Sequence, residues 1–453
     1  MRGTLVSVAA SLAVLASAAA ARAEDLRVPG DFRNLQKALD AAQPGDRVLV
    51  LRGVHRGPCT LSTPMVEVVA GPKARLVGIR GTARHEGSPA LVLQGYGDVV
   101  RGATFDRGGV RVRAGGVTVE GCTFRRFDNR SGQDGFTVDV CGDGAVVAGN
   151  RILGETKTLA GIVVDGDDAA VVGNSIDATE MVNGVFVRGD RPVVTDNDLS
   201  LAGVDRDRFN PEGMILIGSD GSVSGNRLVG ASLWVGGDGN TVEGNAVAET
   251  TLYRASLRVQ GDGNDVLDNG VAGGADTGFL VEGDGNWVGG NSVEDQGSVV
   301  TAYSRNQGMV DYSVGHGIVV RGSGNALLGN SVAGCLGDAY RVVGNDGHVF
   351  VVDPETGVGT WESYVLGPGN EVSGCAGNAA TGCGLGNWTS GTSVTDSDFT
   401  DNGVDVVDGS GFDVFDGNTF VTGGPGYAGS GNGADLPDVW GGTWDFTGVD
   451  PAD

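Results

Sequence analysis

The sequence predicts an all-β protein, a right-handed single-stranded parallel β-helix of roughly 12–13 coils with a short N-terminal capping helix. Two observations support this. A Gly-Asn pair between apolar residues recurs along the chain, and a second short apolar strand with period-two alternation recurs between these pairs. Glycine, with 82 residues, follows no three-residue period, so a turn-rich β architecture is favoured over collagen.

Residues 1–23 have the pattern of a secretory signal. Arg2 precedes an apolar stretch from Leu5 to Leu15, and Ala21 and Ala23 frame a cleavage site. We expect a mature chain that begins at Glu24 and is exported to the periplasm or the extracellular space. No later segment has ~18 consecutive apolar residues, so no membrane span is expected.

Residues 24–58 are expected to cap the first coil, because a coil cannot bury its own apolar face and the ends of a solenoid must be covered. Phe32, Leu35, Leu39 and Ala42 recur at helical spacing. The sequence Gln-Pro-Gly-Asp at 43–46 ends the helix before a strand at 48–51.

Residues 59–420 carry the repeat. The Asn of each Gly-Asn pair is expected at a corner of the coil, where stacked amides form a hydrogen-bonded asparagine ladder. Earlier and later coils place Ala103, Cys122, Cys375 and Ser397 at this position. The Gly-Asn or Asp-Asn pairs end at Asn150, Asn174, Asn197, Asn226, Asn245, Asn269, Asn291, Asn330 and Asn418.

The second strand of each coil has the pattern Gly-apolar-x-Val, as at 161–164, 184–187, 278–281 and 317–320. A tight turn follows it, written GDGN at 261–264 and 283–286 and GSGN at 322–325. Glycine suits this turn because it adopts positive φ without strain.

Residues 421–453 are Gly-rich and form either a C-terminal cap or a tail. Six Cys residues in an exported chain can form disulfides, and Cys375 with Cys383 is the one pair close enough in sequence to favour. None of the Cys residues has the CxxC spacing of a zinc site.

The formal net charge is −26, and removal of Arg2 and Arg22 with the signal makes it more negative still. A strongly acidic chain argues against nucleic acid or an anionic membrane as a partner, because both require a basic face.

The segment FRNLQKALDAAQPGDRVLVLRGVHRG at 32–57, followed by Gly-Asn coils up to about Phe420, resembles the pectin-lyase-like superfamily of parallel β-helix proteins. The resemblance implies the fold, but not one chemistry, because the superfamily includes lyases, hydrolases, esterases, epimerases and non-catalytic proteins. It also implies that substrate lies on the outer face of one sheet, which transfers here to the Gly-apolar-x-Val strands.

Three insertions, at 200–212, 294–315 and 344–368, border that strand column, and loops on rigid scaffolds often carry function. We call the outward face of the strands between these insertions the floor. Trp234 is expected either to stack on a sugar or to be covered by a loop. The alternation predicts two outward columns on the floor: Ile215, Trp234, Arg258, Leu280 and Val319, and beside them Gln260, Glu282 and Arg321.

The candidate catalytic residues are His316, Arg321, Arg341, Tyr303 and Tyr312, and the candidate substrate-binding residues are Trp234, Arg258, Gln260, Glu282 and Arg305. An Arg would neutralise a uronate carboxylate, and a His or Tyr would remove the neighbouring proton. The alternative, which we favour, is that Arg305, Arg321 and Arg341 are solvated or pair with Glu282 and other acids.

Two short motifs have a functional and a structural interpretation. Gly315-His316-Gly317 resembles part of a polygalacturonase motif but lacks its aspartates, so a structural His is favoured. Asp353-Pro354-Glu355 resembles part of the alginate epimerase signature, with Thr356 in place of its His, and a β-hairpin is favoured.

Two sets of acids are also candidates. Asp139 and Asp165 are expected at equivalent positions on adjacent coils, where they could form a glycosidase pair. Asp143, Asp167, Asp190, Asp238, Asp262 and Asp284 recur at one turn, where Ca²⁺ is a candidate ligand and solvated turn residues are the default.

The leading hypothesis is an exported protein that binds or processes an extended polysaccharide; if it is an enzyme, a uronate lyase is favoured over a hydrolase or an epimerase. The alternative is a non-catalytic surface, adhesive or assembly scaffold. A third resemblance, to β-helix proteins that mature the copper centre of nitrous oxide reductase, has little support from four His and five Met residues.

Overall fold

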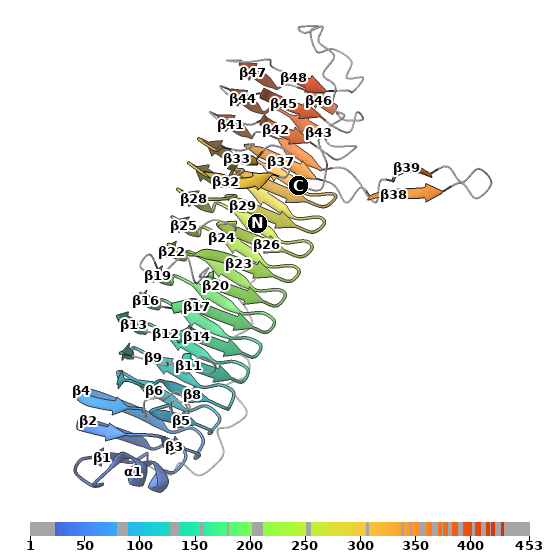
Figure 1. The fold of residues 1–453 in the computed structure, drawn as a ribbon. Helices are drawn as coiled ribbons and strands as arrows, with labels where there is room; N and C mark the ends of the chain where they lie inside the picture. Colours follow the sequence, from blue (N-terminus) through green and yellow to red (C-terminus); the bar gives the residue numbers. More distant parts are fainter. Residues whose placement is uncertain are drawn as a thin grey trace. The chain divides into compact units, whose positions relative to one another are not determined.

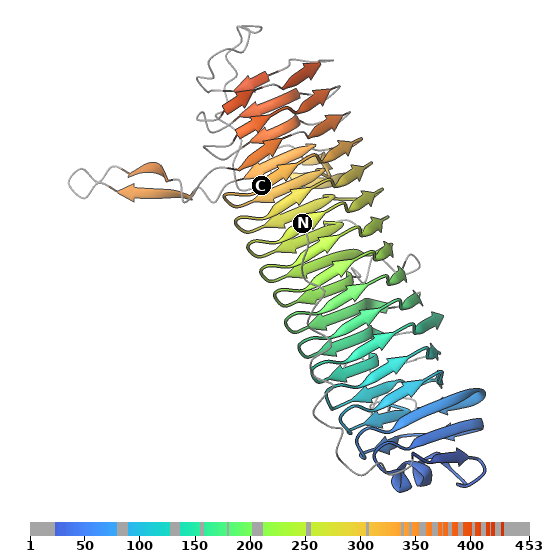
Figure 2. The ribbon, with the colours of Figure 1, turned by 180° about the vertical axis from the view of Figure 1, so that it is seen from behind.

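The computed structural model divides the chain into two compact units, 1–170 and 171–453. Within each unit, parallel strands stack coil upon coil (Figure 1, Figure 2). The described residues are 23–78, 89–126, 136–154, 158–178, 181–201, 212–250, 255–304, 308–336, 339–343, 347–352, 359–364, 370–373, 375–378, 383–387, 393–400, 404–408, 414–416, 418–421 and 427–429.

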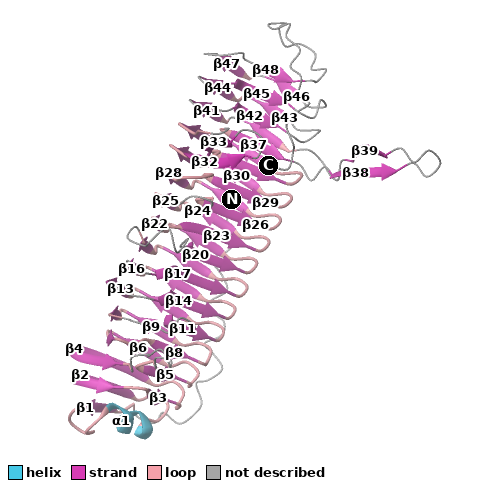
Figure 3. Cartoon of the chain, viewed as in Figure 1, coloured by secondary structure: helices cyan, strands magenta, loops and turns pink. Residues whose placement is uncertain are grey.

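The N-terminal cap is present as predicted. Among the described residues the one helix is α1 (Leu35–Ala41), coloured cyan in Figure 3. It begins at Asn34, whose side chain accepts a hydrogen bond from the Lys37 N–H at 3.0 Å, and Leu35 and Leu39 are buried. The chain enters through a strand that the sequence did not indicate, β1 (Asp25–Val28), which pairs in parallel with β2 (Arg47–Arg56).

The coils of the first unit contribute strands to three parallel sheets, called sheets 1, 2 and 3. Sheet 1 contains β3 (Cys59–Leu61), β5 (Leu91–Leu93), β8 (Val110–Val112), β11 (Phe136–Cys141) and β14 (Thr158–Asp165). Sheet 2 contains β1, the first half of β2 and of β4 (Glu67–Val77), β6 (Val99–Arg101), β9 (Thr118–Glu120) and β12 (Val146–Ala148). Sheet 3 contains the second halves of β2 and β4, β7 (Thr104–Asp106), β10 (Thr123–Arg125) and β13 (Arg151–Gly154).

The second unit repeats this arrangement. Its sheet 1 contains β17 (Met181–Arg188), β20 (Glu212–Ile217), β23 (Ser232–Gly236), β26 (Leu257–Gln260), β29 (Phe279–Glu282), β34 (Ile318–Arg321), β37 (Tyr340–Val343), β42 (Cys383–Asn387), β45 (Val404–Asp408) and β48 (Tyr427–Gly429). Its sheet 2 contains β15 (Ala170–Val172), β18 (Val193–Thr195), β21 (Ser222–Ser224), β24 (Thr241–Glu243), β27 (Asp265–Leu267), β30 (Trp287–Gly289), β35 (Ala326–Leu328), β40 (Glu371–Ser373), β43 (Ser393–Thr395) and β46 (Val414–Asp416). Its sheet 3 contains β16 (Ser175–Ala178), β19 (Asp198–Ser200), β22 (Arg227–Val229), β25 (Ala246–Ala248), β28 (Gly270–Ala272), β31 (Ser292–Glu294), β36 (Ser331–Ala333), β41 (Ala376–Asn378), β44 (Asp398–Thr400) and β47 (Thr419–Val421).

Two of the predicted insertions contain antiparallel hairpins. The strands β32 (Ser298–Ser304) and β33 (Gly308–Val314) pair with each other between β31 and β34. The strands β38 (Gly347–Val352) and β39 (Gly359–Tyr364) pair between β37 and β42, which confirms the hairpin interpretation of the segment around Asp353. Asp353 itself and most of the insertion at 200–212 lie outside the described residues.

The interior of each unit is apolar, and it is filled by the middle residue of each short strand. In the second unit Val223, Val242, Val266 and Val288 lie one above another in sheet 2 and are fully buried. In the first unit Phe105 and Phe124 stack face to face, 4.7 Å between ring centroids. Because each coil covers the apolar face of the next, burial of this surface favours stacking.

The predicted asparagine ladder is present in the second unit. Each side-chain Oδ1 accepts the backbone N–H of the Asn one coil earlier, as Asn269 does from Asn245 and Asn291 does from Asn269, at 2.9–3.0 Å. The Asn269 Nδ2 donates to the Val242 carbonyl at 2.8 Å. These amides are almost completely buried, so an unpaired donor or acceptor there has no water to replace its partner.

A second ladder lies at the other end of sheet 2, where the sequence indicated only tight turns. The Asn of the GDGN-type turns also stacks, with backbone N–H to Oδ1 hydrogen bonds of 2.8–2.9 Å from coil to coil. The members are Asn240, Asn264, Asn286, Asn325 and Asn370. Both corners that flank sheet 2 are therefore held by buried amides.

Cys375 occupies the first ladder after Asn330, as the alignment of coils predicted. It is a free, buried thiol, so the expected Cys375–Cys383 disulfide is not formed. The Asn330 amide donates to its Sγ at 3.8 Å, and its own N–H donates to Ser397. Burial raises the pKa of the Cys375 thiol, which keeps the sulfur protonated and unreactive.

Asn269→Ala is expected to lower the free energy of unfolding by about 2–3 kcal/mol, because it leaves the buried Asn245 N–H without its acceptor and removes the amide hydrogen bond to the Val242 carbonyl. Chemical denaturation would measure the loss. Asp268→Asn is the matched control, since Asp268 is exposed with φ of 52°, which Asn tolerates. Equal effects of the two changes would contradict the role of the ladder.

In the first unit, Asp98 lies at a turn of the GDGN type and is fully buried. Its two oxygens accept the Val66 and Gly95 backbone N–H groups at 3.1 Å. These hydrogen bonds favour the ionised carboxylate, but burial is the larger effect and raises the pKa of Asp98 to about 7.

This raised pKa predicts a pH-dependent stability. Above pH ~4 the unfolded chain has lost the proton of Asp98, while the folded chain still binds it. Binding of this proton therefore stabilises the folded chain at low pH, and the stabilisation is lost as the pH rises through about 7. The difference in melting temperature between the native protein and Asp98→Asn should therefore change between pH 5 and pH 8. A constant difference would show that Asp98 does not titrate in this range.

Candidate functional site

The floor lies on sheet 1 of the second unit, and the strand registers reproduce its predicted columns. Trp234 lies opposite Ile215 and Arg258, and Leu280 lies opposite Arg258 and Val319. Arg341 continues this column beyond Val319. Gly236, Gln260, Glu282 and Arg321 form the neighbouring column. The period-two alternation therefore located these residues correctly from sequence.

Burial changes which floor residues can meet a ligand. Ile215 and Val319 are only 3% and 4% exposed, so neither contributes accessible surface. Trp234 is half-buried and has a partner that neither prediction named: the Arg258 guanidinium lies over its ring, 5.5 Å from the centroid. Gln260 is exposed.

Glu282 connects two arginines of the floor. It accepts from the Arg258 Nη2 at 2.6 Å and from the Arg321 Nη1 at 3.2 Å. The favoured interpretation is confirmed for Arg321, which pairs with Glu282 as expected; the pair with Arg258 was not predicted. The carboxylate thus neutralises part of the positive charge that the floor would otherwise offer to an acidic ligand.

Arg341 differs from these two arginines. Its Nη1 lies 3.3 Å from the Nε2 of His316, and among the described residues no carboxylate lies within ion-pair distance of it. Because a guanidinium only donates hydrogen bonds, Nε2 serves as the acceptor in this contact when the imidazole is neutral with its proton on Nδ1. The fold thus brings together two candidate residues that are 25 positions apart in sequence.

Two close backbone approaches hold His316. Gly315 has φ of +118°, and a side chain there would collide with the backbone of Gly297 at the base of the β32–β33 hairpin. A Cβ on Gly317 would lie 2.4 Å from the Ala339 carbonyl oxygen. Close packing therefore explains why glycine stands at both positions, without reference to any catalytic motif. The two glycines position the His316 backbone at the entry to β34.

The remaining candidates in the second insertion are only partly placed. Tyr303 pairs with Met309 and Tyr312 with Val300 in the β32–β33 hairpin, while Arg305 lies outside the described residues. The hairpin immediately precedes His316 in the chain. The roles of these three residues stay predictions.

The recurring turn aspartates have a structural function in the described coils. The Oδ1 of Asp238 accepts the Asp262 N–H, and the Oδ1 of Asp262 accepts the Asp284 N–H, both at 2.8 Å. In the first unit the Asp143 carboxylate accepts the Asp167 N–H in the same way. Within the described ranges no group of three or more His, Cys, Asp or Glu residues is arranged to hold a metal ion, and Ca²⁺ stays a prediction.

Asp139 and Asp165 do not form the expected pair. Asp139 lies opposite Val163, and Asp165 lies opposite Cys141, because the buried Val138 and Val140 pair with Ile162 and Val164 and so set the register. The Asp139 carboxylate instead accepts from Arg111 and Arg113 at 3.0 and 2.7 Å. Its oxygens thus have structural partners.

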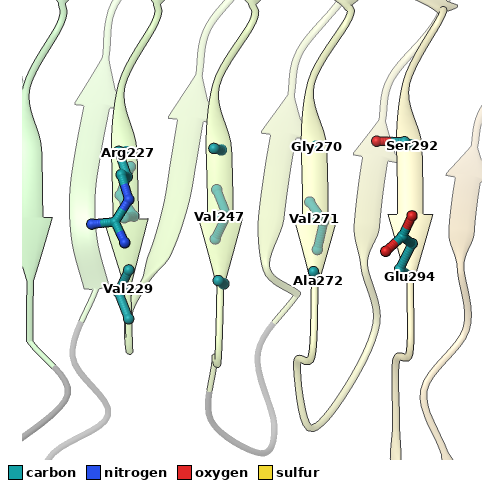
Figure 4. Close-up of a pocket in the computed structure, with 11 residues that line it drawn as sticks. Arg227, Val229, Val247, Gly270, Val271, Ala272, Ser292 and Glu294 are labelled. Atoms are coloured by element: carbon teal, nitrogen blue, oxygen red, sulfur yellow. The ribbon is translucent and has the colours of Figure 1, made fainter.

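Sequence reasoning missed a shallow hollow of about 290 Å³ on sheet 3 of the second unit (Figure 4). The bottom of the hollow consists of small outward residues of β25 and β28, including Gly270 and Ala272. Arg227 and Val229 border it on one side, and Ser292 and Glu294 border it on the other. Arg227 pairs with Asp198 at 3.1 Å. Among the lining residues the charged ones are Arg227 and Glu294, which lie on opposite sides, so the hollow provides space but does not bring an acid and a base together.

No protein-family model matches the chain, and no curated protein matches it. Solved structures similar to it include the alginate lyase AlyF-OU02 with G6, at 15% identity and a TM-score of 0.48, covering 90% of this chain and 89% of that one. Others are a PL6 alginate lyase with a trisaccharide (15%, 0.47, covering 84% and 86%) and the catalytic domain of a GH87 α-1,3-glucanase with tetrasaccharides (12%, 0.46, covering 90% and 70%). These distantly similar structures are of polysaccharide-active proteins. The identities and TM-scores are too low to assign their substrates or reactions to this chain.

No described helix combines the length and the apolar character needed to cross a bilayer.

Glu282→Gln is expected to release Arg258 and Arg321 from their shared carboxylate. The free energy of unfolding should fall by about 1 kcal/mol or less, since these pairs are partly solvated. Affinity for an acidic polysaccharide should rise, which calorimetric titration would measure. Glu294→Gln, an exposed change of the same charge on sheet 3, is the control; the same gain in affinity there would show a mere net-charge effect.

Proposed function

We propose that this chain is an exported protein that binds and cleaves an extended acidic polysaccharide on the floor between Trp234 and Arg341. The observation that carries the proposal is the contact of 3.3 Å between Arg341 and His316. It places a cation without a described carboxylate partner beside a nitrogen that can accept a proton. Export is proposed from the N-terminal sequence.

The pair has the properties that elimination on a uronate requires. Arg341 would bind the sugar carboxylate and stabilise the negative charge that develops on it, which makes the adjacent C–H more acidic. The sugar carboxylate would replace Nε2 as the acceptor of the Arg341 N–H, which frees the Nε2 lone pair, and His316 would then take that proton on Nε2 as the general base. The C–O bond to the neighbouring sugar then breaks, its electron pair leaves with the oxygen, and the oxygen is protonated by solvent. The product carries a C=C bond.

The rest of the floor would bind the polymer. The partly exposed Arg321 and the exposed Gln260 offer hydrogen-bond donors along the neighbouring column. The spacing between coils is about 4.8 Å, close to the length of one sugar residue. An extended chain that runs across the strands would therefore meet one coil per sugar.

A second candidate is a non-catalytic scaffold. It is favoured by the observation that Glu282 already neutralises two of the floor arginines. A surface whose charges are paired internally suits a structural role as well as a binding one.

The test is incubation of the purified protein with alginate, polygalacturonate and neutral glucans, with unsaturated products followed by ultraviolet absorbance and reducing ends measured chemically. His316→Ala and Arg341→Ala should each lower the rate by about 100-fold or more, the range expected for loss of a general base. Arg227→Ala, an exposed arginine on sheet 3, is the matched control.

Retained lyase activity in both site variants would show that the site is misplaced. Binding without products would support a recognition protein, and reducing ends without unsaturation would indicate hydrolysis. Neither binding nor products on any polymer would favour the scaffold.

A further inference from the structure

The negative charge of the chain is very unevenly distributed. Of the 31 Lys and Arg residues, 19 lie between residues 24 and 170 and 10 between 171 and 453. The same two ranges hold 18 and 39 of the 57 Asp and Glu residues. The first unit is thus close to neutral, while the second is strongly acidic, so the total charge does not describe either one.

Many cations of the first unit lie on one sheet. In sheet 3 the inward residues Leu76, Phe105, Phe124 and Ile152 are buried, and the residues beside them point outward. Arg52 lies opposite Lys73 on adjacent strands. We define the basic face as Arg52, Arg56, Lys73, Arg75, Arg125, Arg126 and Arg151, on or directly after β2, β4, β10 and β13.

The basic face is only slightly neutralised. The Asp106 carboxylate, whose side chain is 3% exposed, accepts from Arg126 at 2.5 Å and also pairs with Arg75. It holds these two guanidiniums in place while both stay partly exposed: 39% of the Arg75 side-chain surface and 55% of that of Arg126. For the other five cations, no ion pair with a described carboxylate is present. Clustered cations without acidic partners repel one another and attract an anionic ligand.

We infer that the basic face binds a linear anionic polysaccharide, whose carboxylate or sulfate groups pair with these side chains. Arginine suits this partner because its planar guanidinium can donate two parallel hydrogen bonds to one oxyanion. Arg52 and Lys73 lie opposite each other on adjacent strands, about 4.8 Å apart. Arg75 and Arg151 lie in one column three strand steps apart, with Thr104 and Thr123 between them. An extended polymer that follows this column would meet a cation at each end of it. This binding is independent of the function proposed for the floor.

The local charge also favours this partner over a membrane or a nucleic acid duplex. Both present a broad, dense negative surface that would also face the acids of the first unit, which holds 18 Asp and Glu residues beside its 19 Lys and Arg residues. A single flexible polymer contacts only the strip that it follows, so it gains the attraction of the basic face with less repulsion from the other acids.

The test is calorimetric titration with polygalacturonate, dextran sulfate and neutral dextran at low and high salt. The quadruple variant Arg52→Gln, Lys73→Gln, Arg125→Gln and Arg151→Gln should bind both acidic polymers at least ~10-fold more weakly, and binding of the native protein should weaken as salt screens it. The control variant Arg33→Gln, Arg47→Gln, Arg101→Gln and Arg227→Gln removes the same charge elsewhere and should bind as the native protein does.

Melting temperatures confirm that both variants fold. In a chain that already carries His316→Ala and Arg341→Ala, the quadruple variant should still lower the affinity at least ~10-fold relative to that chain, which separates the basic face from the floor. The inference is overturned if both quadruple variants lose affinity equally, if neutral dextran binds as tightly as the acidic polymers, or if phosphatidylglycerol vesicles or duplex DNA bind more tightly than either.

Discussion

Hydrogen bonds that run from each coil to the next are the interactions on which every other feature depends. Backbone pairing aligns the strands, and the two amide ladders fix both corners that flank sheet 2 in the second unit, through residues such as Asn269 and Asn264. Because these groups are buried, a shift of one coil would leave donors and acceptors without water or partners. The register is therefore strongly specified, and the apolar interior follows from it.

This constraint leaves the outward residues as the chemically variable part of the molecule. They meet their counterparts one coil away, at a distance that suits ion pairs. Glu282 joins Arg258 and Arg321, Asp139 joins Arg111 and Arg113, and Arg101 lies between Glu67 and Glu120. Several charges that look like candidate site residues in the sequence are thus paired between coils. The residues without such partners are the more informative ones.

Two places stand out by this criterion. Arg341 contacts His316 instead of a carboxylate, and the basic face of the first unit has one buried acid, Asp106, for seven cations. The sequence did not predict the basic face, because the argument against a basic surface used the net charge of the whole chain. Charge acts over about 10 Å in salt, so its local distribution decides what a surface binds.

The sequence by itself determined the coil, the capping helix, the first ladder, the hairpin around Asp353 and the outward columns of the floor, because periodicity and glycine turns are local properties. The tertiary structure alone decided the rest. It made the GDGN asparagines a second ladder, left Cys375 a free thiol, offset Asp139 from Asp165, buried Ile215 and Val319, and gave Trp234 an arginine partner. These outcomes depend on which residues meet across coils that are 19 to 45 positions apart, and insertions of variable length hide that register from the sequence.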